Sequence, residues 1–90
     1  MGTSSPDVGG RETVTVRYWA GARAAAGVDE DAVTAVSSVD DLLARLLAAR
    51  PGLATVLPVC SVLVGGRAST GADPVPPGAV VEVLPPFAGG

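Results

Sequence analysis

One amphipathic segment, residues 38–50, constrains the fold of this 90-residue chain more than any other part. Ser38 begins it, and Asp41 completes the S-x-x-D pattern that caps a helix N-terminus. Arg50 lies in the expected last turn, where the helix dipole favours a cation, and a Pro-Gly pair then stops the helix. Because one face carries an apolar stripe, we expect the helix to cover one face of a sheet. The stripe consists of Val39, Leu42, Leu43, Leu46 and Leu47.

Several short segments have the β-branched composition of strands. Residues 13–19 alternate, so Val14, Val16 and Tyr18 share the face expected to be core, and Trp19 falls on the polar face. A second strand should run antiparallel to the first after a short helix over residues 20–26 and an acidic turn. Further strands are expected at residues 32–36, 59–64, 67–69 and 80–84.

The last strand is expected to turn Val81 and Val83 inward and Leu84 outward. The first and last strands both look like interior strands, so they should lie side by side and parallel, with the helix crossing over. The predicted fold is therefore α+β, a β-grasp (ubiquitin-like) arrangement. It combines a mixed sheet of four to five strands with one main helix packed on one face. We assign it to residues 13–84, after a disordered lead-in over residues 1–12.

Composition excludes several function classes. The chain has a net charge of −3 and no histidine, and its six basic residues are isolated arginines, so nucleic-acid binding is not expected. No apolar run approaches the ~18 residues that span a bilayer, and residues 1–10 do not resemble a signal peptide, which favours a cytoplasmic location. The only cysteine, Cys60, has no partner for a disulfide or a metal site and is expected to be a small buried hydrophobe.

The final segment, residues 85–90, has the features of an extended tail. Pro85 and Pro86 cannot continue a strand, because each lacks the N–H that a ladder needs. Gly89 and Gly90 have no Cβ and could enter a channel too narrow for other residues. A loose chain end without a function would look the same.

The sequence of this tail, Pro-Pro-Phe-Ala-Gly-Gly, resembles the small, sulfur-carrying subunit of molybdopterin synthase, a MoaD/ThiS-type ubiquitin-like carrier. Residues 16–20 are similar to the first strand of that family, and residues 38–42 to its helix start. Residues 77–81 are similar to its Gly-Asp-Glu-Val turn, but Ala79 and Val80 replace the charges. The resemblance extends over residues 13–90.

The resemblance implies a carrier that is not itself catalytic. An activating enzyme would use ATP to adenylate the carboxylate of Gly90, and a sulfurtransferase would supply the sulfur for a thiocarboxylate. Ala88 and Gly89 would thread into the large synthase subunit, in a heterotetramer. The sulfur would then pass to a cyclic pyranopterin precursor and form the dithiolene of molybdopterin. No permanently bound cofactor is implied.

A contact surface for the partner is expected around the root of the tail. We expect Trp19, Leu84 and Phe87 to form an apolar patch there, since Trp is enriched at interface hot spots. On the resemblance alone, Arg23 would pair with an acidic group of the partner; a solvated arginine is the alternative. Two other functions stay open: sulfur delivery to thiazole or cysteine synthesis or protein conjugation, and a binding module without terminal chemistry.

Overall fold

The computed structural model describes residues 13–86. The predicted lead-in, residues 1–12, and the end of the tail, residues 87–90, lie outside this part. Five strands form one mixed sheet in the order β2-β1-β5-β3-β4. The strands are β1 (Val14–Tyr18), β2 (Glu30–Val33), β3 (Ser61–Val64), β4 (Arg67–Ala68) and β5 (Val80–Leu84).

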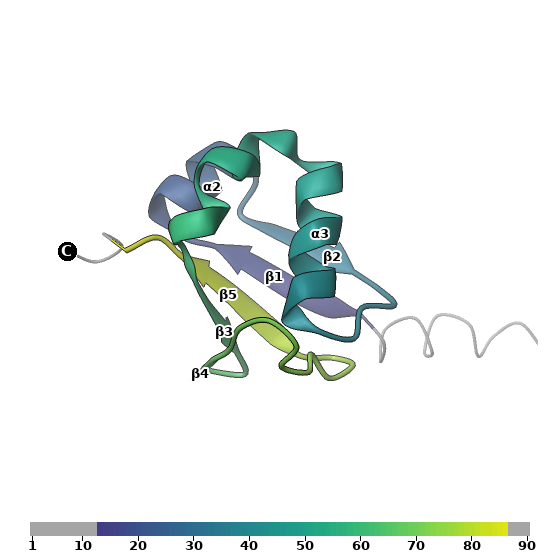
Figure 1. Cartoon of the computed structure of the whole chain (residues 1–90). Helices are drawn as coiled ribbons and strands as arrows, with labels where there is room; N and C mark the ends of the chain where they lie inside the picture. Colours follow the sequence, from purple (N-terminus) through teal and green to yellow (C-terminus); the bar gives the residue numbers. More distant parts are fainter. Residues whose placement is uncertain (1–12, 87–90) are drawn as a thin grey trace, which may run out of the picture.

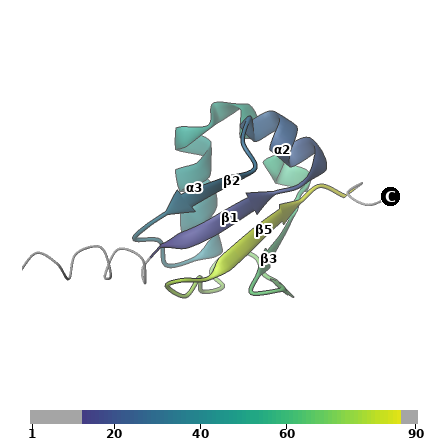
Figure 2. The same ribbon diagram turned by 180° about the vertical axis from the view of Figure 1, so that it is seen from behind.

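The helices lie on one face of this sheet (Figures 1 and 2). The longest is α3 (Val39–Ala49), and the others are α2 (Ala20–Ala26) and the 3-10 helices η1 (Pro51–Thr55) and η2 (Leu57–Val59). The predicted α+β, β-grasp arrangement is confirmed. Among the described residues, no helix combines the length and the apolar character needed to cross a bilayer.

The centre of the sheet is the parallel pair of β1 and β5, as predicted. Thr15 lies opposite Val80 and Tyr18 opposite Val83, while β2 and β3 add antiparallel strands on the two sides. The alternation of each central strand decides its buried face. Val14, Val16, Tyr18, Val81 and Val83 are all 3% exposed or less, and they form the floor of the core beneath α3.

Two predicted strands had boundaries that were wrong by two or more residues. β2 begins at Glu30, inside the predicted acidic turn, because Glu30 lies opposite Arg17 and their side chains form an ion pair of 3.7 Å. It ends at Val33, after which the Arg45 guanidinium binds the carbonyl oxygens of Thr34 and Ala35 at 3.0 Å each. Those two residues are therefore outside the sheet.

β3 begins two residues later than predicted. Pro58 lies in the first turn of η2, which occupies residues 57–59, and Val59 is 61% exposed there instead of extended in the sheet. The preceding residues, which the sequence indicated to be an irregular connector, form η1 and η2. These short helices bury Leu53 and Leu57 under the open end of the core.

The N-terminus of α3 is capped by Ser38. Its Oγ accepts a hydrogen bond from the backbone N–H of Asp41 at 3.1 Å, which confirms the predicted cap. The carboxylate of Asp41 accepts from the N–H of Ser37 at 3.2 Å, one residue earlier than the capping box predicts. Both interactions hold the first turn of α3 against the preceding loop.

The buried stripe of α3 is narrower than the sequence indicated. Val39, Leu42 and Leu46 are at most 1% exposed, whereas Leu43 is half-buried and Leu47 is 36% exposed. Because the sheet beneath is small, only the side chains that face it directly are covered. The prediction that Leu47 belongs to the core was wrong.

The short helix α2 ends as predicted on Gly27, whose φ of 82° is in the left-handed region that glycine adopts without strain. α2 packs closely on η1. A Cβ at Gly52 would lie 2.9 Å from the carbonyl oxygen of Ala25, so glycine is required for this approach.

A cluster of polar side chains joins β1, β2 and the end of α3. Tyr18 Oη donates to Asp31 Oδ2 at 2.7 Å, and Arg50 donates to both carboxylate oxygens of Asp31 at 2.5 and 2.6 Å. Arg50 also donates to the carbonyl of Ala26 at 3.3 Å. The predicted position of Arg50 in the last turn was wrong, since α3 ends at Ala49 and the guanidinium crosses to β2.

Candidate functional site

The root of the tail lies where the central strands end. β1 and β5 run side by side in the same direction, toward the edge where α2 begins (Figure 2). Leu84 ends β5, and the chain continues through Pro85, which is half-buried, and Pro86, which is exposed. The strand therefore ends at the proline pair, as predicted.

Trp19 is placed at this root by its backbone. Its N–H donates to the carbonyl of Val83 at 3.1 Å, which continues the ladder between β1 and β5 by one residue. Its own carbonyl accepts from Ala22 at 2.9 Å at the start of α2. Between these bonds, Ala20 has a φ of 47°, a value that residues other than glycine rarely adopt. The hydrogen bonds on both sides therefore determine where the indole lies.

The indole of Trp19 is accessible. It is 38% exposed, and the guanidinium of Arg17 lies 5.5 Å from the ring centroid, within the range of a cation–π contact. This contact leaves a large part of the ring open to solvent. Trp19 thus has the exposure expected of a contact residue, although an interface role remains a prediction.

Leu84 lies on the same outward face as Trp19. Tyr18 pairs with Val83, so the next step in the same register brings Trp19 beside Leu84. On its other side Leu84 lies opposite Ser61 of β3. Two of the three residues of the predicted apolar patch thus occupy neighbouring positions at the ends of adjacent strands, and the patch itself stays a prediction; the third, Phe87, lies outside the described residues, as do Ala88, Gly89 and Gly90.

Arg23 lies on α2, one turn beyond Trp19. Its Nη1 is 3.8 Å from Asp29 Oδ1, and the two side chains are 58% and 81% exposed. Such an exposed pair contributes little to stability and can be exchanged for another carboxylate. The predicted contact of Arg23 with an acidic partner group is therefore sterically open, and it stays a prediction.

The sequence from the middle of β1 onward matches one protein family. The profile of the ThiS family covers residues 16–90, most of the chain. The chain belongs to the ThiS family. A comparison with curated proteins found no significant match.

Solved structures similar to this ThiS-family protein share its fold over nearly their whole length. One is described as molybdopterin converting factor subunit 1 from Pyrococcus furiosus, with 26% identity and a TM-score of 0.75, covering 83% of this chain and 98% of that one. Another is a complex of subunits 1 and 2 of molybdopterin-converting factor from Helicobacter pylori, with 25% identity, a TM-score of 0.66 and coverage of 87% and 99%.

A third similar structure is the small archaeal modifier protein SAMP1 of Haloferax volcanii. It is 24% identical, with a TM-score of 0.76, and the match covers 87% of this chain and 99% of that one. At this identity the likeness shows the fold alone. The ThiS-family protein thus has the fold of the ThiS/MoaD sulfur carriers, a fold that ubiquitin-like modifiers also have.

The thiol of Cys60 lies near the tail root of this ThiS-family protein, next to Ser61, which pairs with Leu84. Cys60 is half-buried beside the start of β3, and burial raises the pKa of its thiol, which keeps it protonated and unreactive at neutral pH. It packs against the core, close to the predicted role of a buried hydrophobe. Among residues 13–86, no group of histidine, cysteine and acidic residues could hold a metal ion.

Sequence analysis missed the cluster of Tyr18, Asp31 and Arg50. One signal was present: Tyr18 was assigned to a buried face, where a phenol needs a hydrogen-bond partner. The partners could not be inferred, because Asp31 is 13 residues away and Arg50 is 32 residues away along the chain. The hydrogen bond from Arg50, followed by that from Tyr18, overcomes the effect of burial and lowers the pKa of Asp31.

Proposed function

We propose that this protein is a sulfur carrier that serves as the small subunit of molybdopterin synthase. The observation that supports it best is the placement of Pro85 and Pro86. They leave the central strand of a ThiS-family β-grasp domain beside Trp19 and Leu84, two apolar side chains on one face. The described chain thus leaves the sheet through the proline pair, next to a surface suited to protein contact.

The proposed chemistry takes place on the carboxylate of Gly90. A bare carboxylate has no leaving group, so an activating enzyme transfers AMP from ATP to it and releases pyrophosphate. Sulfide sulfur from a sulfurtransferase then attacks the acyl carbon, AMP leaves, and a thiocarboxylate remains. The carrier supplies no acid, base or metal ligand to these steps; its contribution is a reactive end held on a folded body.

The proposed acceptor is a cyclic pyranopterin precursor bound to a large synthase subunit. Two carriers, each donating one sulfur, complete the dithiolene within a heterotetramer. The similar Helicobacter pylori structure is a complex of subunits 1 and 2 of molybdopterin-converting factor, which supports a partner of this kind. We assign Ala88 and Gly89 to the threaded segment. Trp19, Leu84 and Phe87, together with Arg23, would contact the partner, and the pathway is cytoplasmic.

Intact-mass measurement tests this proposal directly. The full chain is incubated with ATP, a candidate activating enzyme and a sulfur donor, and we expect its mass to change by one oxygen-to-sulfur exchange at Gly90. A variant lacking Gly90 is the control, with an unchanged circular-dichroism spectrum and no exchange. A native terminus that never gains sulfur with any activating enzyme would reject sulfur carriage.

Sulfur delivery to another pathway is the second candidate, and the match to the ThiS family as a whole favours it. The partner that co-purifies with the tagged chain separates the two: a large synthase subunit supports molybdopterin, whereas an enzyme of thiazole or cysteine synthesis, or covalent protein adducts, supports the alternative. One extra residue after Gly90 distinguishes both from a pure binding module, because only a carrier loses activity with it.

A further inference from the structure

Arg67 differs from the other described arginines in having no acceptor. Among residues 13–86, Arg17 and Arg23 lie beside carboxylates, Arg45 binds two backbone carbonyls and Arg50 binds Asp31. The guanidinium of Arg67 makes no hydrogen bond or ion pair within this part of the chain. An arginine fork without an acceptor has up to five N–H donors available to a ligand.

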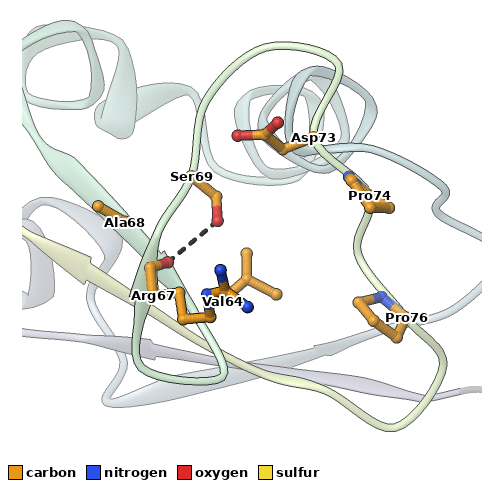
Figure 3. Close-up of a pocket in the computed structure, with 7 residues that line it drawn as sticks. All are labelled: Val64, Arg67, Ala68, Ser69, Asp73, Pro74 and Pro76. Atoms are coloured by element: carbon orange, nitrogen blue, oxygen red, sulfur yellow. Dashed lines mark hydrogen bonds between the residues drawn. The ribbon is translucent and has the colours of Figure 1, made fainter.

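The Arg67 side chain extends into a cavity of about 370 Å³. Figure 3 shows its guanidinium beside Val64, with Pro74 and Pro76 on the opposite wall, and Arg67 as a whole is exposed to solvent. This orientation follows from the sheet register. Arg67 lies opposite Val64, on the face where the neighbouring strands carry core residues, but at the edge of the sheet next to the loop over residues 69–79.

The walls of this cavity are fixed by the fold. The hairpin that positions Arg67 turns through Gly65 and Gly66, whose φ angles of 57° and 84° suit glycine. Opposite, Val75 is 2% exposed and its N–H donates to the carbonyl of Ser37 at 3.0 Å. The hairpin on one side of the cavity and the loop on the other are thus each anchored to the body of the domain.

The other polar side chains of the cavity already have partners. Ser69 Oγ donates to the carbonyl of Arg67 at 3.0 Å, and Asp73 Oδ2 accepts from the N–H of Thr70 at 2.9 Å. The available donors thus come from one guanidinium, which matches the two oxygens of a carboxylate. The carboxylate of Asp73, which also lines the cavity, repels any anion there, and it repels a dianion such as phosphate more strongly than a singly charged carboxylate. Val64, Pro74 and Pro76 provide apolar contacts for the methylene groups of an acidic side chain.

We propose that this cavity, the Arg67 pocket, is a docking site for a glutamate or aspartate side chain presented by a partner protein. It lies beside the β3–β4 hairpin, at the end of the sheet where β5 begins, whereas the tail root lies where β5 ends. The pocket is therefore separate from the proposed sulfur-transfer end. This inference goes beyond the proposed function and does not depend on it.

Nuclear magnetic resonance titration of the ¹⁵N-labelled full chain tests the proposal. The probe is the blocked tripeptide acetyl-Gly-Glu-Gly-amide, and the matched control peptide carries glutamine in place of glutamate. We expect saturable shifts at the Arg67 Nε–H and at the backbone of Ser69 with the glutamate peptide. In Arg67→Gln, the affinity for the glutamate peptide should fall about tenfold or more, because the charge-assisted hydrogen bonds from the guanidinium are lost.

Two controls keep this result specific. Arg17→Gln removes another exposed arginine, one that already pairs with Glu30 at 3.7 Å, and should bind the glutamate peptide as the original chain does. Inorganic phosphate, titrated alone, should shift the same signals more weakly. The proposal is overturned if no saturable shift occurs, if the glutamine peptide or phosphate binds equally well, or if folded Arg67→Gln retains the affinity.

Discussion

The phenolic oxygen of Tyr18 in β1 lies 2.7 Å from a carboxylate oxygen of Asp31 in the adjacent strand β2. Both oxygens of the same carboxylate are bound by Arg50, which follows the last residue of α3. The cluster therefore joins the first strand, the edge strand and the main helix through one acidic side chain. Burial, followed by the neighbouring carboxylate, raises the pKa of the Tyr18 phenol, so Tyr18 remains a hydrogen-bond donor at neutral pH.

The cluster predicts a dependence of stability on pH. The pKa of Asp31 is lowered in the folded state, chiefly by the hydrogen bonds from Arg50. Ionised Asp31 therefore stabilises the fold fully at pH values above the unfolded pKa of about 3.9. This contribution is lost as the pH falls through the folded pKa. Urea unfolding between pH 7 and pH 2 should show that the free energy of unfolding falls more steeply with decreasing pH for the original chain than for Asp31→Asn. Parallel curves of free energy against pH would contradict this account.

Tyr18→Phe tests the hydrogen bond without changing the packing of the ring. We expect it to lower the free energy of unfolding by about 1 kcal/mol at pH 7, since one partly buried hydrogen bond to a charged acceptor is lost. Urea unfolding measures the difference. In the Asp31→Asn background the same substitution should cost less, and an equal cost in both backgrounds would show that the phenol and the carboxylate are not coupled.

Two leucines of α3 should differ strongly in their contribution to stability. Leu46→Ala leaves a cavity in the core and should cost about 2–4 kcal/mol, because Leu46 is 1% exposed. Leu47→Ala is the matched control on the next position, with 36% exposure, and should cost less than about 1 kcal/mol. Denaturant midpoints compare them, and similar losses would mean that Leu47 packs as the sequence pattern predicted.

The cap of α3 should be measurable in the same way. Ser38→Ala removes the oxygen that accepts from the N–H of Asp41 and should cost about 1 kcal/mol. Ser37→Ala is the control, because the bond that Ser37 makes to Asp41 uses its backbone N–H and survives the substitution. Equal losses in the two variants would argue against a capping role for the Ser38 hydroxyl.

Trp19→Glu tests the proposed contact patch. A charge on this exposed indole position should weaken binding to the large subunit about tenfold or more, if Trp19 is an interface anchor. The thermal midpoint should change little, since the backbone bonds of Trp19 remain and Arg17 lies close by. Ala48→Glu, on the exposed side of α3, serves as the control. Unchanged affinity of the Trp19 variant would remove the patch from the proposal.

The parts of the fold that depend on local patterns could be predicted from the sequence. Alternation in β1 and β5 identified the buried faces, and Ser38 marked the start of α3. Parallel pairing of the first and last strands followed from their apolar character and the single long helix. These features are encoded within a few neighbouring residues, so one sequence is sufficient to infer them.

Features that depend on tertiary contacts could not be predicted. Glu30 is a strand residue because it pairs with Arg17 of β1, and Leu47 is 36% exposed although its neighbour Leu46 is buried. The Arg67 pocket exists only because a loop packs beside the β3–β4 hairpin. Of the candidate site, Trp19 and Leu84 lie at neighbouring positions where β1 and β5 end, and their role as a contact patch stays a prediction, whereas the residues that follow Pro86 lie outside the described part of the chain.

The position of β5 has a mechanical consequence. It is hydrogen-bonded on both sides, to β1 and to β3, and Thr15 pairs with Val80, 65 positions further along the sequence. A pull applied beyond Pro86 therefore acts along two ladders and loads their bonds together instead of opening them one by one. An unfolding ATPase that pulled on this end would therefore need a high force to unfold the domain. A partner protein that binds and draws in only the tail would leave the folded domain intact.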